Sequence, residues 1–353
     1  MPNLLIATDL HISVEEKNYS FAVLDEIIEN ALSYDALLLL GDTFNTFEDV
    51  KSLKDDFNRR IEYYKKPVYI LKGNHELLKS NNIKLSNLQF PNNVNIIEDI
   101  DVFDIDEAII VAVAYNEEYN INDSIINEIK KLDNIIFIGH GIVEGTLWSL
   151  ESGEDKASIP IELIKKINPK LAIIGHIHKN MELNINNINI IYPGSARVWR
   201  RSKSEMGIRK CLGINVSNGI ITKKYINLKS AGEYRVYEVS IDSIESLLDR
   251  EAINWSIEDI IDISVYGIIE DENDFSKKIK DIINKYKKYI RAINIKTDKL
   301  FLLENAKNEN IIKEFLDVIN NYNINDEEKD ILELAKKIGI EKIYSALQSK
   351  KNI

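Results

Sequence analysis

The chain has 353 residues, with 45 Lys plus Arg, 57 Asp plus Glu, five His and one Cys, so its formal net charge is -12. Its 44% hydrophobic and 29% charged residues are typical of a soluble globular protein and exclude a disordered or membrane-spanning chain. A single cysteine excludes an intrachain disulfide, and the start of the chain lacks a signal-peptide pattern, so we expect a cytoplasmic protein with no membrane partner.

The first 195 residues alternate short apolar runs with helical patterns, which predicts an α/β layered domain. Helices are predicted at 19–32 and 161–167, where apolar residues recur three and four positions apart. Strands buried on both faces are predicted at 4–7, 36–40, 68–71, 109–114, 135–138, 171–174 and 188–192. Polar residues follow several of these strands, at the carboxyl ends where α/β sheets build their sites.

The pattern of apolar and polar residues changes near residue 234, where a smaller α+β domain is predicted to begin. Strands are predicted at 234–241, 260–268 and 289–295, with helices at 244–250 and 275–286. Beyond 299 we expect helices at 311–319 and 341–348, and between them one that starts at a capping box at 325–328 and that Gly339 ends. We therefore expect domains at 1–230 and 231–300, followed by a helical tail at 301–353.

All five histidines lie in the turns that follow predicted strands, together with three residues that offer carboxylate or amide oxygens. The set is Asp9, His11, Asp42, Asn74, His75, His140, His176 and His178. Imidazole and carboxylate ligands without a thiol suit manganese, iron or zinc better than magnesium or calcium, and this many ligands implies two metals. Two ions roughly 3.5 to 4 Å apart stabilise the attacking and departing oxygens of a phosphoryl displacement. The pattern predicts hydrolysis of a phosphoester.

The spacing of these residues supports one shared site. Asp9 and His11 are two positions apart, as are His176 and His178, and such pairs point to one side of an extended segment. A glycine precedes four of the residues, which predicts tight turns where the backbone leaves the sheet. Each residue alone has a simpler explanation, because a lone loop His is usually satisfied by hydrogen bonds and a lone Asp or Asn suits a cap or turn. Their joint occurrence favours the metal site.

The sequence resembles the calcineurin-like metallophosphoesterase superfamily over about its first 195 residues. The motifs D-x-H, G-D, G-N-H, G-H and G-H-x-H occur in order as Asp9-Leu-His11, Gly41-Asp42, Gly73-Asn74-His75, Gly139-His140 and Gly175-His176-Ile-His178. The resemblance implies a layered sheet sandwich with flanking helices and a first metal held by Asp9, His11, Asp42 and His178. It implies a second metal held by Asp42, Asn74, His140 and His176. Asp42 would bridge the two, and His75 would position the phosphate or act as general acid.

The segment after the last histidine pair is similar to the SbcD family, the nuclease subunit of the SbcCD DNA repair complex. The similarity lies in Ile191-Tyr-Pro-Gly-Ser195, the polar loop with Glu205 and Gly207, a closing strand at 212–216, and the Gly41-Asp42-Thr-Phe44 turn. It implies a manganese-dependent 3′-5′ exonuclease and single-strand endonuclease that acts in double-strand break repair or DNA end processing. The implied partners are DNA, an SbcC-like coiled-coil ATPase that docks on 308–348, and a second copy in a homodimer. Residues 231–300 would cap the DNA.

Three departures from the family pattern indicate a divergent branch. Ile-Ser follows His11 where Leu-Gly is common, Asn45 stands where His or Asp is frequent, and Glu76 stands where Asp is commoner. None of them removes a predicted ligand, but they leave the preferred strand or end of a DNA substrate open.

The densest basic cluster of this acidic chain follows Gly194-Ser195, and it is predicted to contact DNA. Its residues are Arg197, Trp199, Arg200, Arg201 and Lys203. Cations meet phosphates and an aromatic face can stack on a base, although a solvated loop that balances nearby acids is the alternative. For the whole chain two other functions stay open: a small-molecule or cyclic-nucleotide phosphodiesterase, and a non-enzymatic module that tethers an ATPase to DNA. The apolar stripe at 311–319 suits either an internal core or a partner surface.

Overall fold

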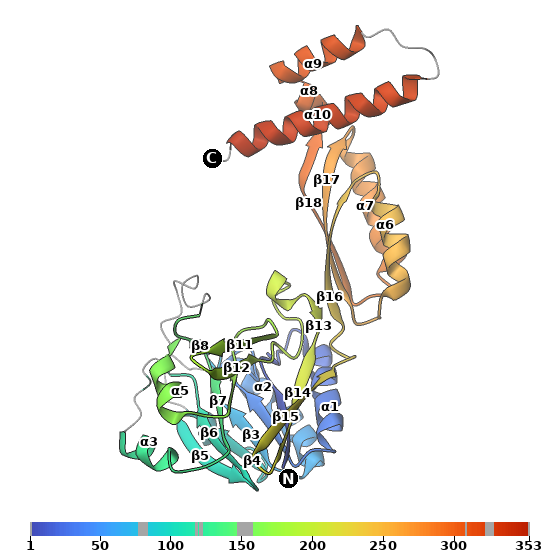
Figure 1. The fold of residues 1–353 in the computed structure, drawn as a ribbon. Helices are drawn as coiled ribbons and strands as arrows, with labels where there is room; N and C mark the ends of the chain where they lie inside the picture. The colour runs from blue at the N-terminus through green and yellow to red at the C-terminus, as the bar shows by residue number, and fades with distance from the viewer. Residues whose placement is uncertain are drawn as a thin grey trace. The chain divides into compact units, whose positions relative to one another are not determined.

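The computed structural model describes residues 2–76, 84–116, 119, 123–146, 158–307, 309–321 and 328–351. The chain divides into two compact units, Met1–Tyr234 and Arg235–Ile353 (Figure 1). We predicted boundaries near 230 and 300, and both predicted C-terminal segments fall in the second unit. Within the described residues, no helix is long and apolar enough to cross a membrane.

Two six-stranded sheets form the first unit. One has the order β15-β14-β1-β2-β3-β4, built from β1 (Asn3–Ala7), β2 (Ala36–Leu40), β3 (Val68–Leu71), β4 (Val94–Ile97), β14 (Lys210–Ser217) and β15 (Ile220–Asn227). The other has the order β11-β12-β10-β7-β6-β5, built from β5 (Ile100–Ile105), β6 (Ala108–Val113), β7 (Ile135–His140), β10 (Leu171–Gly175), β11 (Met181–Ile185) and β12 (Ile188–Tyr192). The central strands are parallel, and antiparallel strands lie at one edge of the first sheet and at both edges of the second.

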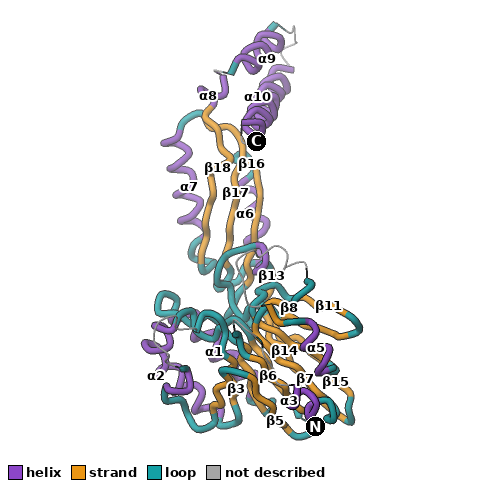
Figure 2. The backbone as a smooth tube through the Cα atoms, turned by 90° about the vertical axis from the view of Figure 1, so that its left-hand side faces the viewer, coloured by secondary structure: helices purple, strands orange, loops and turns teal. Residues whose placement is uncertain are grey.

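Helices cover the outer face of each sheet (Figures 1 and 2). Helices α1 (Lys17–Ala31) and α2 (Phe47–Tyr64) pack on the first sheet, and α3 (Asp123–Ile129) and α5 (Ile161–Ile167) pack on the second. Successive side chains of a strand point to opposite faces, so Leu4 and Ile6 lie in the core between the sheets while Leu5 and Ala7 pack under the helices. Both faces are buried, which explains the continuous apolar runs. The predicted α/β layered sandwich is confirmed.

Several elements of the first unit were not predicted. Helix α2 is the largest, although its buried residues recur every three or four positions and Thr46 caps its start by accepting a hydrogen bond from the Asp49 N–H. Strands β4, β5, β11 and β15 were also missed. The first unit also contains β8 (Ile142–Val143), β9 (Ser158–Ile159) and β13 (Gly207–Ile208).

The second unit is an α+β layer followed by helices. Strands β16 (Glu233–Ser240), β17 (Ile260–Ile269) and β18 (Ala292–Leu302) are adjacent in one sheet, and α6 (Ile244–Glu251) and α7 (Glu272–Tyr286) share its core. The helices that follow are α8 (Leu303–Lys307), α9 (Asn310–Asn320) and α10 (Lys329–Lys351). The stripe predicted at 311–319 is divided: Ile312 is fully buried, while Ile311 is half exposed.

The prediction that Gly339 ends a helix is wrong, because α10 continues through it. A Cβ at this position would lie 2.1 Å from Cζ of Phe315 on α9. The glycine therefore permits close helix packing, and it does not act as a C-cap. The predicted capping box lies mostly outside the described residues, since 325–327 are not among them.

Candidate metal centre

The predicted ligands come together where strands of both sheets end. Asp9 follows β1, Asp42 follows β2, and His140 is the last residue of β7. The ends of β2 and β7 are joined directly, because Nδ1 of His140 lies 2.8 Å from the Leu40 carbonyl oxygen and donates to it. Four of the predicted ligands have at most 2% of their surface exposed: Asp9, His11, Asp42 and His140.

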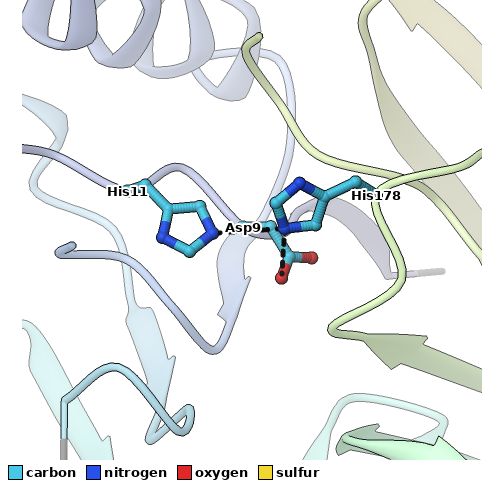
Figure 3. Close-up of side chains that lie close together, drawn as sticks. All are labelled: Asp9, His11 and His178. Carbon is cyan, nitrogen blue, oxygen red and sulfur yellow. Dashed lines mark hydrogen bonds and ion pairs between the residues drawn. The ribbon is translucent and has the colours of Figure 1, made fainter. Parts of the chain in front are cut away.

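Asp9, His11 and His178 form the first cluster (Figure 3). The Nε2 atoms of His11 and His178 lie 3.2 Å apart, and Nε2 of His178 lies 3.7 Å from Oδ1 of Asp9. The Asp9 carboxylate is held in place by the His176 N–H, which lies 3.0 Å from both of its oxygens. Three of the four residues predicted for the first metal thus converge from the turns that follow β1 and β10.

Asp42, Asn74, His140 and His176 form the second cluster. Oδ1 of Asn74 lies 3.1 Å from Nε2 of His140 and 2.9 Å from Nδ1 of His176. Oδ2 of Asp42 lies 3.3 Å from Nε2 of His140 and 3.9 Å from Nε2 of His11 in the first cluster. Asp42 therefore faces both clusters, which is the position a bridging carboxylate needs.

The donor chemistry of both clusters fits divalent cations. Nδ1 of His140 is occupied by a backbone carbonyl, so Nε2 is the ring atom that faces the Asp42 and Asn74 oxygens and that would bind a cation in place of its proton. Burial lowers the pKa of His11 well below its usual value, so this imidazole is neutral, as a metal ligand must be. Its Nδ1 is buried without a hydrogen-bond partner among the described residues.

Electrostatics at the second cluster favour positive charge. Burial by itself lowers the pKa of His140, but the carboxylates of Asp42 and Asp9 and a hydrogen bond to Leu40 raise it to about 9. Burial raises the pKa of Asp42, and the neighbouring imidazoles His140 and His11 more than compensate, so the pKa of this carboxyl is strongly lowered. The carboxylate is charged at neutral pH, and the potential it creates attracts a cation.

The backbone of the ligands is not extended, which corrects the interpretation of the paired spacing. Asp9, His11, Asp42 and His176 have φ values of 53°, 45°, 49° and 92°. Non-glycine residues rarely adopt this left-handed region, and such strain gathers at functional sites. Hydrogen bonds between the two turns hold it, since the His11 N–H donates to the Asp42 carbonyl oxygen at 2.8 Å.

The glycines before the ligands serve two purposes. Gly41 has a φ of 81°, and a Cβ there would lie 2.1 Å from Nδ1 of His140. Gly73 has no such φ, but a Cβ at this position would lie 2.1 Å from Oδ1 of Asp42. Close approach of ligand side chains is thus a reason for glycine that the sequence pattern alone did not suggest.

Residues 2–180 match the family model of calcineurin-like phosphoesterases. The chain belongs to this family. Its members are metal-dependent phosphoester hydrolases with a dinuclear metal centre, and the two clusters are the candidate ligands of that centre. No curated protein matches the chain in sequence.

Solved structures are similar to the phosphoesterase unit at low sequence identity. A purple acid phosphatase from yellow lupin (Lupinus luteus) seeds has 12% identity over 66% of this chain and 52% of its own, with a TM-score of 0.46. An archaeal phosphodiesterase has 15% identity over 64% and 99%, with a TM-score of 0.34. Vps29 of Entamoeba histolytica in complex with zinc has 11% identity over 64% and 99%, with a TM-score of 0.31.

His75 of the phosphoesterase site lies beside the clusters, and two hydrogen bonds orient it. Its Nδ1 donates to the Asn45 carbonyl oxygen at 2.8 Å, and its N–H donates to Oδ1 of Asp42 at 2.9 Å. The imidazole ring stands edge-on to His11, with centroids 4.7 Å apart. With Nδ1 occupied, Nε2 is the atom left for a substrate oxygen.

Two of the residues that depart from the family pattern, Glu76 and Asn45, form hydrogen bonds that hold the turns of the site. The buried carboxylate of Glu76 accepts hydrogen bonds from the N–H groups of Phe44 at 3.0 Å and Gly73 at 2.8 Å. Burial and the nearby Asp42 carboxylate raise the pKa of Glu76 to about 7. Asn45 uses its backbone carbonyl for His75, so its side-chain type is not needed for that contact.

The residues of the predicted DNA-contact loop differ in exposure and in what they contact. Trp199 stacks on His11 with ring centroids 3.8 Å apart and planes at 9°, and the Arg200 guanidinium lies 4.2 Å over the Trp199 ring. Arg200, Arg201 and Lys203 are exposed.

The prediction for Arg197 is wrong, because this side chain is fully buried. Its Nε donates to the Leu10 carbonyl oxygen at 2.6 Å, its Nη2 donates to the His11 carbonyl oxygen, and its Nη1 pairs with Glu16 at 2.5 Å. Arg197 therefore fixes the turn that carries the first ligands and offers no free group to a nucleic acid.

Glu205 is a site residue that the sequence analysis gave no role. It is fully buried, and its Oε1 lies 2.5 Å from Nδ1 of His178. Burial raises its pKa, but hydrogen bonds from His178 and from the backbone of Trp199 and Arg200 outweigh that effect and lower it. The signal in the sequence was an acid inside the most basic loop of the chain.

Proposed function

We propose that this phosphoesterase is a manganese-dependent DNA nuclease with 3′-5′ exonuclease and single-strand endonuclease activity. The observation that carries the proposal is the position of Trp199 and Arg200, an aromatic face and a cation next to His11 of the metal centre. Base stacking on an aromatic ring and contact of a cation with the backbone are how proteins hold single-stranded nucleic acid. The sequence resemblance to SbcD supports the same substrate.

The chemistry follows from the side chains that surround the phosphate. When bound, two divalent cations supply Lewis acidity and lower the pKa of the attacking water. With Nδ1–H donating to the Asn45 carbonyl oxygen, His75 acts as general acid in its imidazolium form, whose Nε2–H donates its proton to the departing oxygen and leaves a neutral imidazole. Asp42 both faces the two clusters and accepts the His75 N–H, so it aligns the acid with the metal centre.

The alternative is a small-molecule or cyclic-nucleotide phosphodiesterase, because the same metal ligands beside Trp199 and Arg200 suit a phosphodiester of any size. In the discriminating experiment, the purified protein is incubated with manganese or magnesium. Its substrates are labelled linear and hairpin DNA, 3′,5′-cyclic nucleotides and bis(p-nitrophenyl) phosphate, each tested separately. The proposal expects DNA cleavage that is strongest with manganese. Turnover of cyclic nucleotides without DNA cleavage would support the alternative, and no turnover of any substrate would support the tethering module.

Variants of the loop make the test sharper. We expect Arg200→Ala to weaken DNA cleavage through KM while it leaves hydrolysis of bis(p-nitrophenyl) phosphate unchanged, because only DNA extends beyond the metal centre. Arg59→Ala is the matched control, since its side chain is also exposed but lies on α2 and pairs with Asp56. Equal effects of the two variants on DNA would contradict a DNA contact at Arg200.

The partners belong to the same proposal. We propose that the enzyme acts in DNA end processing as a cytoplasmic homodimer, with 231–300 capping the DNA and 301–353 docking on an SbcC-like coiled-coil ATPase. Light scattering of the purified chain tests the dimer. Co-purification with a coiled-coil ATPase encoded beside this gene tests the docking, and full binding by a chain truncated after Lys299 would contradict it.

A further inference from the structure

One buried carboxylate joins the first metal cluster to the loop that carries Trp199. Oε1 of Glu205 lies 2.5 Å from Nδ1 of His178. Its Oε2 accepts three backbone hydrogen bonds, from the N–H groups of Trp199 at 2.9 Å, Arg200 at 2.8 Å and Arg201 at 3.0 Å. Glu205 itself is fully buried, so these four partners replace the water it gives up.

Arg209 forms hydrogen bonds with the backbone next to both His178 and Glu205. Its Nη1 donates to the His178 carbonyl oxygen at 3.1 Å, and its Nη2 donates to the Met206 carbonyl oxygen at 3.0 Å. Met206 directly follows Glu205 in the chain. The backbones of His178 and of the Glu205 segment are thereby tied to one guanidinium, which fixes the distance between imidazole and carboxylate.

The contacts of Glu205 require a group with two acceptors and no donor. Three backbone N–H groups can only donate, so Oε2 must accept. His178 presents Nε2 to Asp9 and His11 across the first cluster, which leaves the ring proton on Nδ1 and makes Oε1 an acceptor as well. A glutamine has the same size but one acceptor atom and one donor atom. It must therefore lose either the hydrogen bond from His178 or the three hydrogen bonds from the backbone N–H groups.

We propose that Glu205 is a positioning residue of the phosphoesterase site with two roles. It holds His178 in the tautomer whose Nε2 is free to bind metal, and it anchors the 199–201 backbone so that Trp199 stays stacked on His11. Loss of the carboxylate therefore weakens binding of the first metal and loosens the Trp199 ring that stacks on His11. The inference rests on the metal centre of the proposed function, and it holds whether or not DNA is the substrate.

The test compares metal binding by Glu205→Gln with Glu182→Gln, in which the replaced Glu holds Lys223 and Tyr225 at a partly exposed position. Calorimetric titration with Mn²⁺ should show about 10- to 100-fold weaker binding of one equivalent in Glu205→Gln and wild-type binding of the other. Co²⁺ absorption should report altered geometry at that one position. Wild-type affinity and spectrum in Glu205→Gln would overturn the proposal.

A second readout follows the loop through tryptophan fluorescence. Trp199 stacks on a metal-ligand ring, so Mn²⁺ should quench a component of the emission that Trp199→Phe removes. In Glu205→Gln this quenching should fall, while Glu182→Gln should retain it. Unchanged quenching in Glu205→Gln would remove the anchoring role.

Measurement of the unmodified protein keeps the proposal testable if Glu205→Gln does not fold. Nitrogen-15 spectra of the five histidines in the zinc-loaded protein distinguish the tautomers. One imidazole with protonated Nδ1 and metal-bound Nε2 should be lost in His178→Ala, and a bare Nδ1 at this residue would refute the inference. Failure of the wild-type chain to bind metal would instead refute the proposed function, and normal metal binding without DNA cleavage would refute only the substrate.

Discussion

Replacement of Arg197 by methionine separates the structural role of this residue from the predicted nucleic-acid contact. Arg197→Met keeps most of the apolar stem but removes the donors to the carbonyl oxygens of Leu10 and His11, both at the turn that carries the first ligands. A buried carbonyl group without a donor costs about 1–3 kcal/mol. Glu16 also loses its ion pair with Arg197, though about a third of its side chain is exposed, which limits that cost. We expect the free energy of unfolding to fall by about 3–5 kcal/mol.

The assay is thermal unfolding followed by circular dichroism, together with DNA binding at a temperature where the variant is folded. A loss of this size lowers the melting temperature of a domain of this length by roughly 10 °C. Arg200→Met is the control, because Arg200 is exposed and its replacement should change stability by no more than about 0.5 kcal/mol. If Arg197→Met kept wild-type stability and lost DNA affinity, the structural reasoning would be refuted and the original sequence prediction restored.

Three further predictions concern the metal centre. His75→Leu should keep both metals and lose about 10²- to 10⁴-fold in kcat on a dinucleotide but far less on a p-nitrophenyl ester, whose leaving group needs no proton; equal losses would contradict the general acid. Asp42→Ala should lose bound metal by elemental analysis and hydrolyse no substrate, as should the chelator-treated wild type, and normal turnover in the variant would contradict the bridging role. Gly41→Ala should displace the His140 ring and weaken metal binding. Gly145→Ala is the control, since Gly145 also has a positive φ but open space around a Cβ, and it should lower only stability. Equal metal binding by the two variants would refute the close-approach argument.

The composition of the site was accessible from sequence because histidine is rare in this chain. Five histidines placed after predicted strands, with Asp9, Asp42 and Asn74, need no tertiary information to suggest one cavity. The positions of the buried strands along the chain followed from the apolar runs, since a strand covered on both faces is almost entirely apolar. Helix α2 was within reach of the same reasoning, because Phe47, Val50 and the apolar residues that follow them recur at helical spacing.

The geometry of the site was not accessible, because it depends on contacts between distant parts of the chain. The left-handed backbone of His11 is held by a hydrogen bond to the Asp42 carbonyl oxygen, and no local pattern indicates it. Arg197 and Arg200 are three positions apart in one basic loop, yet one is fully buried and the other is exposed. They differ because Arg197 donates hydrogen bonds to the Leu10 and His11 carbonyl oxygens in the turn after β1, which is distant in sequence.

The net acidity of the chain is consistent with a polyanionic substrate once the site is considered locally. Asp9, Asp42 and Glu205 are buried carboxylates around imidazoles, and the raised pKa of His140 shows that this environment favours positive charge. Divalent cations are therefore attracted by the protein first, and they in turn supply the positive field that a phosphodiester meets. If DNA is the substrate, as proposed, we expect its affinity to depend on bound metal more than on the overall charge of -12, with exposed cations such as Arg200 guiding the flanking backbone.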